Sequence, residues 1–146
     1  MDPQTPYAAL SRAARHGRDF YCDALGRIGH GPLQRIFRNL AGAKTQLAWS
    51  LDGVCTRSDA HASAFWAPEF DALSQCYAEL REQFADPNDL ECLERLADAE
   101  ARMVTSFEHA IDACLDDTVR QILRRNLPRV RACAEQAREL EFALAG

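Results

Sequence analysis

One stretch of the chain, residues 87–115, constrains the fold more than any other. It reads PNDLECLERLADAEARMVTSFEHAIDACL, and apolar residues recur in it at steps of three and four. This spacing predicts one long amphipathic helix, because 3.6 residues per turn bring such positions onto one face. The apolar face comprises Leu90, Leu93, Ala97, Val104, Phe107, Ile111 and Leu115. Glu100 falls in the middle of that face, where a core residue is expected.

Similar spacing predicts helices in most of the remaining chain. We expect them over residues 6–28, 32–54, 68–84 and 118–144. Thr5 followed by Pro6 predicts the first helix start, and Asp117 is the expected cap of the last helix. Gly17 lies in the middle of the first apolar stripe, which indicates that another group approaches closely there. The helix over 68–84 is shorter and broadly aromatic, which suggests an element packed on the outside of a bundle.

Four long helices, each with a single apolar stripe, predict an all-α fold. Their arrangement is expected to be a ferritin-like antiparallel four-helix bundle. The connection through the 60s and 70s supplies the one long crossover, which contains the short extra helix. With 146 residues and no long linker, the chain is predicted to form a single domain over residues 1–146.

Composition limits the partners and the compartment that we expect. The chain has 22 acidic and 17 basic residues, and its net charge of -5 argues against nucleic acid and anionic membranes as partners. No apolar run is long enough to span a membrane, and the opening MDPQTP lacks the features of a secretion signal. We therefore expect a cytoplasmic protein.

Six cysteines are spread along the chain, about one to each helical segment, and none forms a CxxC spacing. They are Cys22, Cys55, Cys76, Cys92, Cys114 and Cys133. In the cytoplasm such cysteines stay reduced and behave as small apolar residues. We predict six unpaired thiols.

Four segments resemble a proteobacterial ferritin-like four-helix-bundle family that is known only as a domain of unknown function. They are HGRDFYCDAL, LQRIFRNLAGAKTQLAWSL, LADAEARMVTSFEHAI and VRQILRRNLPRVRACAEQARELE, one in each long helix. The resemblance covers nearly the whole chain and rests on apolar spacing. It implies a ferritin-like fold and suggests a stress-related role.

The metal ligands of ferritin-like di-iron proteins do not transfer to this chain. Those proteins use Glu-x-x-His pairs on two of their helices. Here the third residue after Glu100 is Met103, and no Glu-x-x-His occurs anywhere. His16, Asp19 and Asp23 resemble a metal cluster in one dimension, but they point away from the first stripe, as solvated residues do. P-loop, GxGxxG, nucleophile-elbow and HExxH motifs are also absent. We predict no metal, no other cofactor and no catalytic residue.

Lys44 interrupts the apolar stripe of the helix over residues 32–54, as Glu100 interrupts that of the helix over residues 87–115. Both lie near the midpoints of their helices, so in a ferritin-like bundle they could meet as a buried pair. In the alternative, Lys44 extends to the rim of the bundle and Glu100 binds Tyr21 or water. Both hypotheses give these residues a structural role.

An arginine strip on the last helix, read alone, predicts an acidic partner or nucleic acid. It consists of Arg120, Arg124, Arg131 and Arg138. The preceding helix, however, has acidic residues along the edge of its own stripe. In an antiparallel hairpin, residues that face one another have numbers with a constant sum. This rule predicts three interhelical ion pairs: Glu94 with Arg138, Glu108 with Arg124, and Asp112 with Arg120.

Two function classes remain from the sequence. The first is a non-enzymatic bundle that acts by binding, as a homo-oligomer or through a protein partner, with a degenerate and metal-free ferritin-like centre. The second is a metal-binding ferritin-like oxidoreductase or metal-handling protein that uses Glu100 as a ligand.

Overall fold

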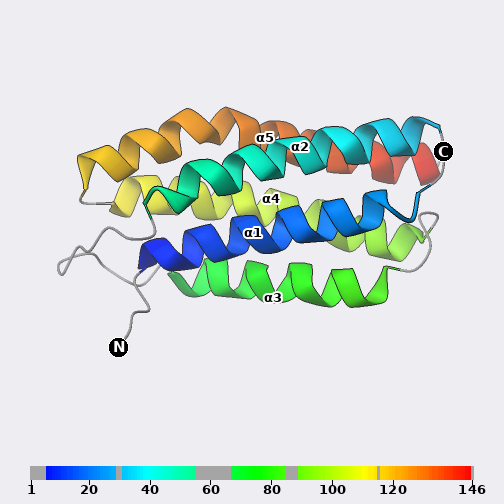
Figure 1. Ribbon diagram of the computed structural model, residues 1–146, viewed down its shortest axis with the longest axis horizontal. Coiled ribbons are helices and arrows are strands. Elements are labelled where there is room, and N and C mark those ends of the chain that lie inside the picture. The colour runs from blue at the N-terminus through cyan, green and yellow to red at the C-terminus, as the bar shows by residue number, and fades with distance from the viewer. Residues whose placement is uncertain (1–5, 29–30, 55–66, 85–88, 115, 146) are drawn as a thin grey trace.

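A computed structural model describes residues 6–28, 31–54, 67–84, 89–114 and 116–145 of the chain. Within these ranges it contains five α-helices and no strand, which confirms the all-α prediction (Figure 1). The helices are α1 (Pro6–Leu25), α2 (Pro32–Asp52), α3 (Ala67–Gln83), α4 (Leu90–Ala113) and α5 (Asp117–Ala145). None of them is long and apolar enough to cross a membrane.

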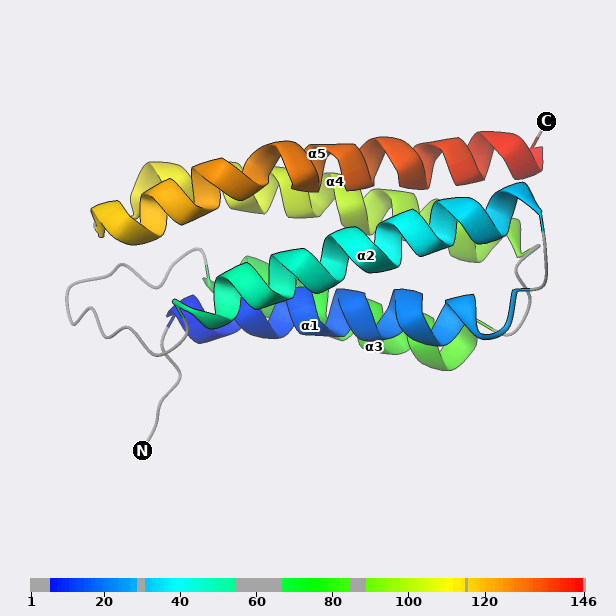
Figure 2. The ribbon, with the colours of Figure 1, turned by 45° about the horizontal axis from the view of Figure 1, so that its top comes forward.

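The five helices form a closed cycle of neighbours. α1 packs against α2 and α3, α4 packs against α3 and α5, and the contact between α2 and α5 closes the cycle. Figures 1 and 2 show that each helix runs in the direction opposite to the one before it. Because five is an odd number, one neighbouring pair must be parallel, and that pair is α1 with α3.

α3 is part of the bundle wall, where the sequence suggested an element on the outside. It lies between α1 and α4 and contacts both. Phe70, Leu73, Tyr77 and Leu80 are fully or almost fully buried. These positions recur at steps of three and four, so a helix of 17 residues still offers a complete apolar stripe to the core.

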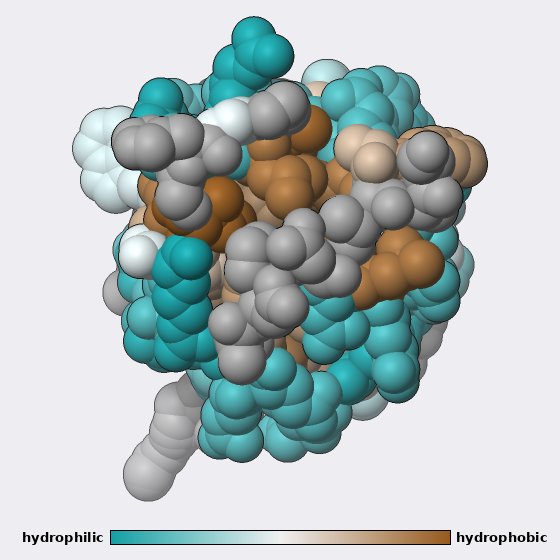
Figure 3. Space-filling model, turned by 90° about the vertical axis from the view of Figure 1, so that its right-hand side faces the viewer, coloured by the Kyte–Doolittle hydropathy of each residue, from teal (hydrophilic) through white to brown (hydrophobic). Residues whose placement is uncertain are grey.

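A single apolar core runs through the bundle. Toward one end, aromatic rings from three segments pack edge to face or tilted, with the Phe84 centroid 5.5 Å from Phe20 and 5.8 Å from Phe37. Figure 3 looks onto the end where α1, α3 and α5 finish, and apolar residues are visible there between polar ones. Two large apolar side chains are exposed among the described residues: Trp49 on α2 and Phe142 in the last turns of α5.

Aspartates set the starts of the last two helices. Asp89 precedes α4 and accepts the backbone N–H of Cys92, so this helix begins at Leu90 and not at the predicted Pro87. Asp116 accepts the N–H groups of Thr118 and Val119, so the cap of α5 is one residue earlier than the predicted Asp117. Thr5, Cys55 and Pro87 themselves lie outside the described residues.

Candidate functional site

The centre of the bundle contains a buried ion pair. Lys44 comes from the middle of α2 and Glu100 from the middle of α4, and both side chains are completely inaccessible to solvent. The Lys44 ammonium donates to Oε1 of Glu100 at 2.6 Å. The structure thus brings together the two polar residues that the sequence places in apolar stripes.

Two tyrosine hydroxyl groups also donate hydrogen bonds to the Glu100 carboxylate. The hydroxyl groups of Tyr21 and Tyr77 each donate to Oε2 of Glu100 at 2.7 Å, and Lys44 Nζ also lies 3.3 Å from the Tyr77 hydroxyl. The first hypothesis is therefore confirmed, since Lys44 and Glu100 meet as a buried pair. Of the alternative, the hydrogen bond from Tyr21 to Glu100 is formed, but the extension of Lys44 to the rim is wrong, because its side chain is completely buried. We call Tyr21, Lys44, Tyr77 and Glu100 the buried polar cluster; α1, α2, α3 and α4 each contribute one member.

The electrostatics of the cluster define its protonation state. Burial alone would lower the pKa of Lys44, but the negative charge of Glu100 and its hydrogen bond leave that pKa above its ordinary value. Burial, together with the neighbouring charge of Glu100, raises the pKa of both Tyr21 and Tyr77 well above the ordinary range. At neutral pH the cluster thus contains a lysine ammonium and two neutral phenols that donate.

α5 adds a thiol beside the cluster. Cys133 is 2% exposed, and burial raises its pKa to about 11. The charges of Lys44 and Glu100 act on this pKa in opposite directions, Lys44 lowering it and Glu100 raising it. A thiol with this pKa is protonated at neutral pH and is a poor nucleophile.

The close approach expected at Gly17 is made by two cluster members. A Cβ atom at Gly17 would lie 3.4 Å from the Tyr77 ring and 3.5 Å from Cδ of Lys44. Sequence reasoning missed Tyr77 and Cys133 as members of the site. The available signal was their mid-stripe position, which many core residues share.

The donor set of the cluster does not fit a ferritin-like metal centre. Such a centre requires several convergent carboxylates and histidines. Here the single carboxylate already accepts three hydrogen bonds, and its neighbours are an ammonium and two neutral phenols. Met103, one turn from Glu100 where the pattern requires histidine, is buried. Among the described residues, no group of three or more His, Cys, Asp or Glu is arranged to hold a metal ion.

The predicted ion pairs between α4 and α5 are wrong. Glu108 pairs with Arg131 at 3.0 Å and not with Arg124. Arg120 pairs with Asp117 of its own helix at 2.6 Å and not with Asp112, and it also donates to the carbonyl of Cys114. All residues of the three predicted pairs are described, and the pairing of Glu94 with Arg138 is likewise not formed.

The direction of helical side chains explains this error. The constant-sum rule compares Cα positions, whereas side chains lean toward the N-terminus of their own helix. In an antiparallel pair, long side chains therefore meet when their Cα atoms are offset along the axis. Arg131 is seven residues beyond Arg124, or about two turns, and its guanidinium lies 3.0 Å from the Glu108 carboxylate.

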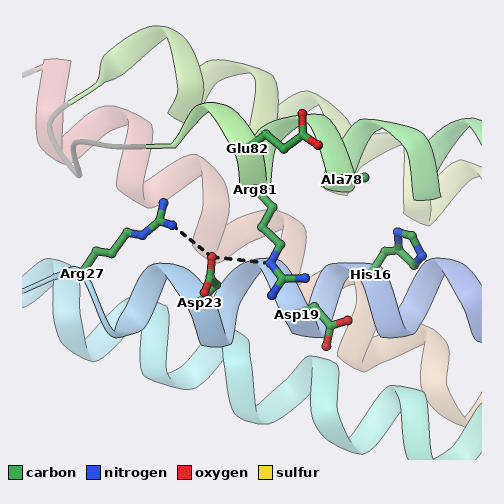
Figure 4. Close-up of a pocket in the computed structure, with 7 residues that line it drawn as sticks. All are labelled: His16, Asp19, Asp23, Arg27, Ala78, Arg81 and Glu82. Atoms are coloured by element: carbon green, nitrogen blue, oxygen red, sulfur yellow. Dashed lines mark ion pairs between the residues drawn. The ribbon is translucent and has the colours of Figure 1, made fainter.

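A hollow of about 490 Å³ lies on the surface between α1 and α3 (Figure 4). It brings His16, Asp19 and Asp23 to one wall, but arginines neutralise these carboxylates. Asp23 Oδ2 lies 3.3 Å from Arg27 and 3.4 Å from Arg81. Asp19 pairs with Arg18 at 3.1 Å, so both carboxylates already have arginine partners and the hollow is a surface groove bridged by ion pairs.

Comparison with known proteins adds no relative. No protein-family model, no curated protein and no solved structure matches the chain.

Proposed function

We propose that this protein is a non-enzymatic helical bundle that acts by binding, through self-association or a protein partner. The observation that supports this is the hydrogen bonding of Glu100. Its carboxylate oxygens accept from Lys44, Tyr21 and Tyr77 in a fully buried centre, so they are not available to a metal ion. A metal-binding role would require this carboxylate to exchange three protein donors for a cation and to find further ligands. The metal-handling alternative therefore lacks a supporting observation.

The buried polar cluster has a structural role in this proposal. A buried charge with one partner removed is strongly destabilising, so the favourable arrangement is the one in which all four members meet. Since each member comes from a different helix, the cluster selects one register for α1, α2, α3 and α4. Apolar contacts alone tolerate shifts of helix packing far more readily.

We also propose that the architecture is ferritin-like. α1 with α2, and α4 with α5, form two hairpins, and α3 runs back along the bundle between them (Figures 1 and 2). This corresponds to a bundle with one long crossover, in which part of the crossover is helical and inserted into the wall. A stress-related role, which the resemblance suggests, remains part of the proposal.

The described cysteines support a cytoplasmic location within the same proposal. Cys22, Cys76, Cys92, Cys114 and Cys133 are all free thiols. Proteins of reducing compartments retain such thiols.

The exposed apolar side chains support action by binding, because Trp49 and Phe142 present large apolar groups to solvent.

Metal content and particle mass together test the proposal. Protein purified from cells without a metal-affinity step should contain no stoichiometric iron, manganese or zinc by elemental analysis. Its mass in solution should exceed that of one chain, or a protein should co-purify with it. Stoichiometric metal that is lost in Glu100→Ala but kept in Glu108→Ala would favour the metal-handling alternative, because Glu108 is a carboxylate on the same helix outside the cluster.

A further inference from the structure

The outward face of α2 has two features that the fold of one chain leaves unexplained. Trp49 is 81% exposed, and Gly42 is exposed in the middle of the helix. Among the described elements, the neighbours of α2 in the bundle wall are α1 and α5, and its buried face, which contains Lys44, contacts α3 and α4 across the core. The side of α2 that faces away from these two helices is open to solvent.

Gly42 differs from the other glycine in the middle of a helix. At Gly17 a Cβ atom would contact Tyr77 and Lys44, so packing inside the bundle accounts for that glycine. At Gly42 nothing lies within 4 Å of the corresponding position. Glycine is the poorest helix former after proline, so this position weakens α2 without an internal reason. A close approach from outside the chain would supply one.

The spacing of Gly42 and Trp49 makes the face complementary to itself. They are seven residues apart, about two turns, and therefore lie on one side of α2. If two copies of α2 pack antiparallel around a twofold axis between Thr45 and Gln46, each Trp49 lies over Gly42 of the other copy. A twofold interface requires such a reciprocal match, because the same patch is used on both sides.

The charges on this face select the antiparallel orientation. Arg35 and Arg38 are exposed in the first half of α2, whereas Asp52 is exposed at its last residue. Asp52 lies at the edge of this face toward α1, where it pairs with Arg15 at 3.2 Å and accepts from Ser11 at 2.6 Å, and its side chain is still 45% exposed. Antiparallel packing brings the arginine end of each helix to the aspartate end of the other. Parallel packing would place arginine against arginine.

We propose that the chain forms a homodimer through this α2 face, with Trp49 of each copy seated on Gly42 of the other. The inference rests on the proposed function and deepens it, since it names the partner as a second copy of this chain. Trp49 is the anchor of the interface, and Gly42, which has no side chain and has open space around its Cβ position, leaves the room that receives it. An aromatic anchor in a fitted hollow is typical of the residues that dominate binding energy.

Sedimentation equilibrium of the full chain tests the dimer. Wild type should have twice the mass of the 16.3 kDa chain at micromolar concentration. Trp49→Ala removes the anchor and Gly42→Leu fills the hollow, and each should raise the dimer Kd at least about 30-fold. Phe142→Ala is the matched control, because it removes the other exposed aromatic residue from a different helix and should leave the Kd unchanged.

Gly42→Leu also separates loss of the dimer from loss of folding. Leucine is a better helix former than glycine, so the variant should unfold at a higher temperature than wild type when both are dilute enough to be monomeric. Trp66 is the other tryptophan of the chain, so Trp66→Phe leaves Trp49 as the source of tryptophan fluorescence. In that variant the emission should shift to shorter wavelength as the protein is concentrated, because the dimer buries Trp49. That shift should be absent in the presence of Gly42→Leu.

Three results would overturn the inference, and they differ in what else they affect. A dimer that persists in both Trp49→Ala and Gly42→Leu places the interface elsewhere and leaves self-association intact. A wild-type mass of one chain at every concentration removes self-association from the proposed function as well. A Kd raised equally by Phe142→Ala shows that the effect is not specific to α2. The elemental analysis that tests the proposed function does not depend on any of these three results.

Discussion

The buried polar cluster makes a quantitative prediction about stability. Glu100→Leu and Lys44→Leu should each destabilise the protein strongly, whereas the double leucine variant should recover most of the loss. The reason is that each single substitution leaves one buried charge without its partner, and the double substitution leaves none. Both side chains are completely buried, so solvent cannot replace the lost partner.

The hydrogen bonds give the two single variants different magnitudes. Lys44→Leu leaves the carboxylate with the donors Tyr21 and Tyr77, and it should cost about 3 kcal/mol. Glu100→Leu leaves the ammonium without a counter-charge, with the Tyr77 hydroxyl at 3.3 Å as its remaining partner, and it also leaves both phenol groups without their acceptor. Its cost should therefore be at least about 1 kcal/mol greater. The double variant retains only the unsatisfied phenols and should lie within about 2 kcal/mol of wild type.

Urea denaturation of the four proteins measures this coupling. We expect the double variant to be more stable than the sum of the single effects predicts, by about 3 kcal/mol or more. The same cycle at Glu108 and Arg131 is the control. Their ion pair is 3.0 Å long, but the side chains are 46% and 54% exposed, so its coupling should be at most about 1 kcal/mol.

Additive effects in the Lys44 and Glu100 cycle would refute the reasoning. In that case the ammonium and the carboxylate would each be stabilised independently of the other. A coupling no larger than that of the surface control would lead to the same conclusion, since burial is the stated cause of the difference.

Three further predictions concern the core. The free energy of unfolding should fall as pH rises above about 9, since folding raises the pKa of Cys92 and Cys133 to about 11 and the unfolded chain releases those protons first. Cys92→Ala with Cys133→Ala should reduce this fall, measured by denaturant melts between pH 9 and 11, while the part due to Tyr21 and Tyr77 remains. Thiol titration of unreduced protein should count all six cysteines after denaturation, and a denatured count near zero contradicts this. In the native state Cys22 should react fastest among the five described cysteines, because it alone of them is exposed. Gly17→Ala should be tolerated or should stabilise the protein by up to about 1 kcal/mol in thermal melts. Gly17→Leu should destabilise it by about 1–3 kcal/mol, because only the larger side chain must displace the Tyr77 ring.

The helices and the central positions of Lys44 and Glu100 could be predicted from the sequence because they depend on local periodicity, whereas the pairing of the two residues was one of two open hypotheses. A residue that interrupts an apolar stripe at mid-helix must be buried when the helix packs, whatever its neighbours are. Lys44 and Glu100 were identified in this way. The location of Gly17 likewise indicated a close approach, although not which residue makes it.

The rest of the site depends on which helices become neighbours. Tyr77 reaches Glu100 only because α3 is inserted between α1 and α4, and no periodicity within residues 67–83 specifies that position. The ion pairs failed for a different reason. Their prediction used Cα register, while the lean of long side chains decides which charges of α4 and α5 meet, as Glu108 and Arg131 show.

Lys44 is the only lysine among the 17 basic residues of the chain, and it is completely buried. Apart from the histidines, every basic side chain on the surface of the folded protein is therefore an arginine, and reagents that acylate ε-amines find no lysine to modify while the bundle is closed. Acylation of Lys44 requires the core to open, so its rate reports how often four helices separate at the centre of the molecule. The same holds for enzymes that attach acetyl groups or ubiquitin to lysine: the native fold presents no lysine acceptor, and only an opened chain does.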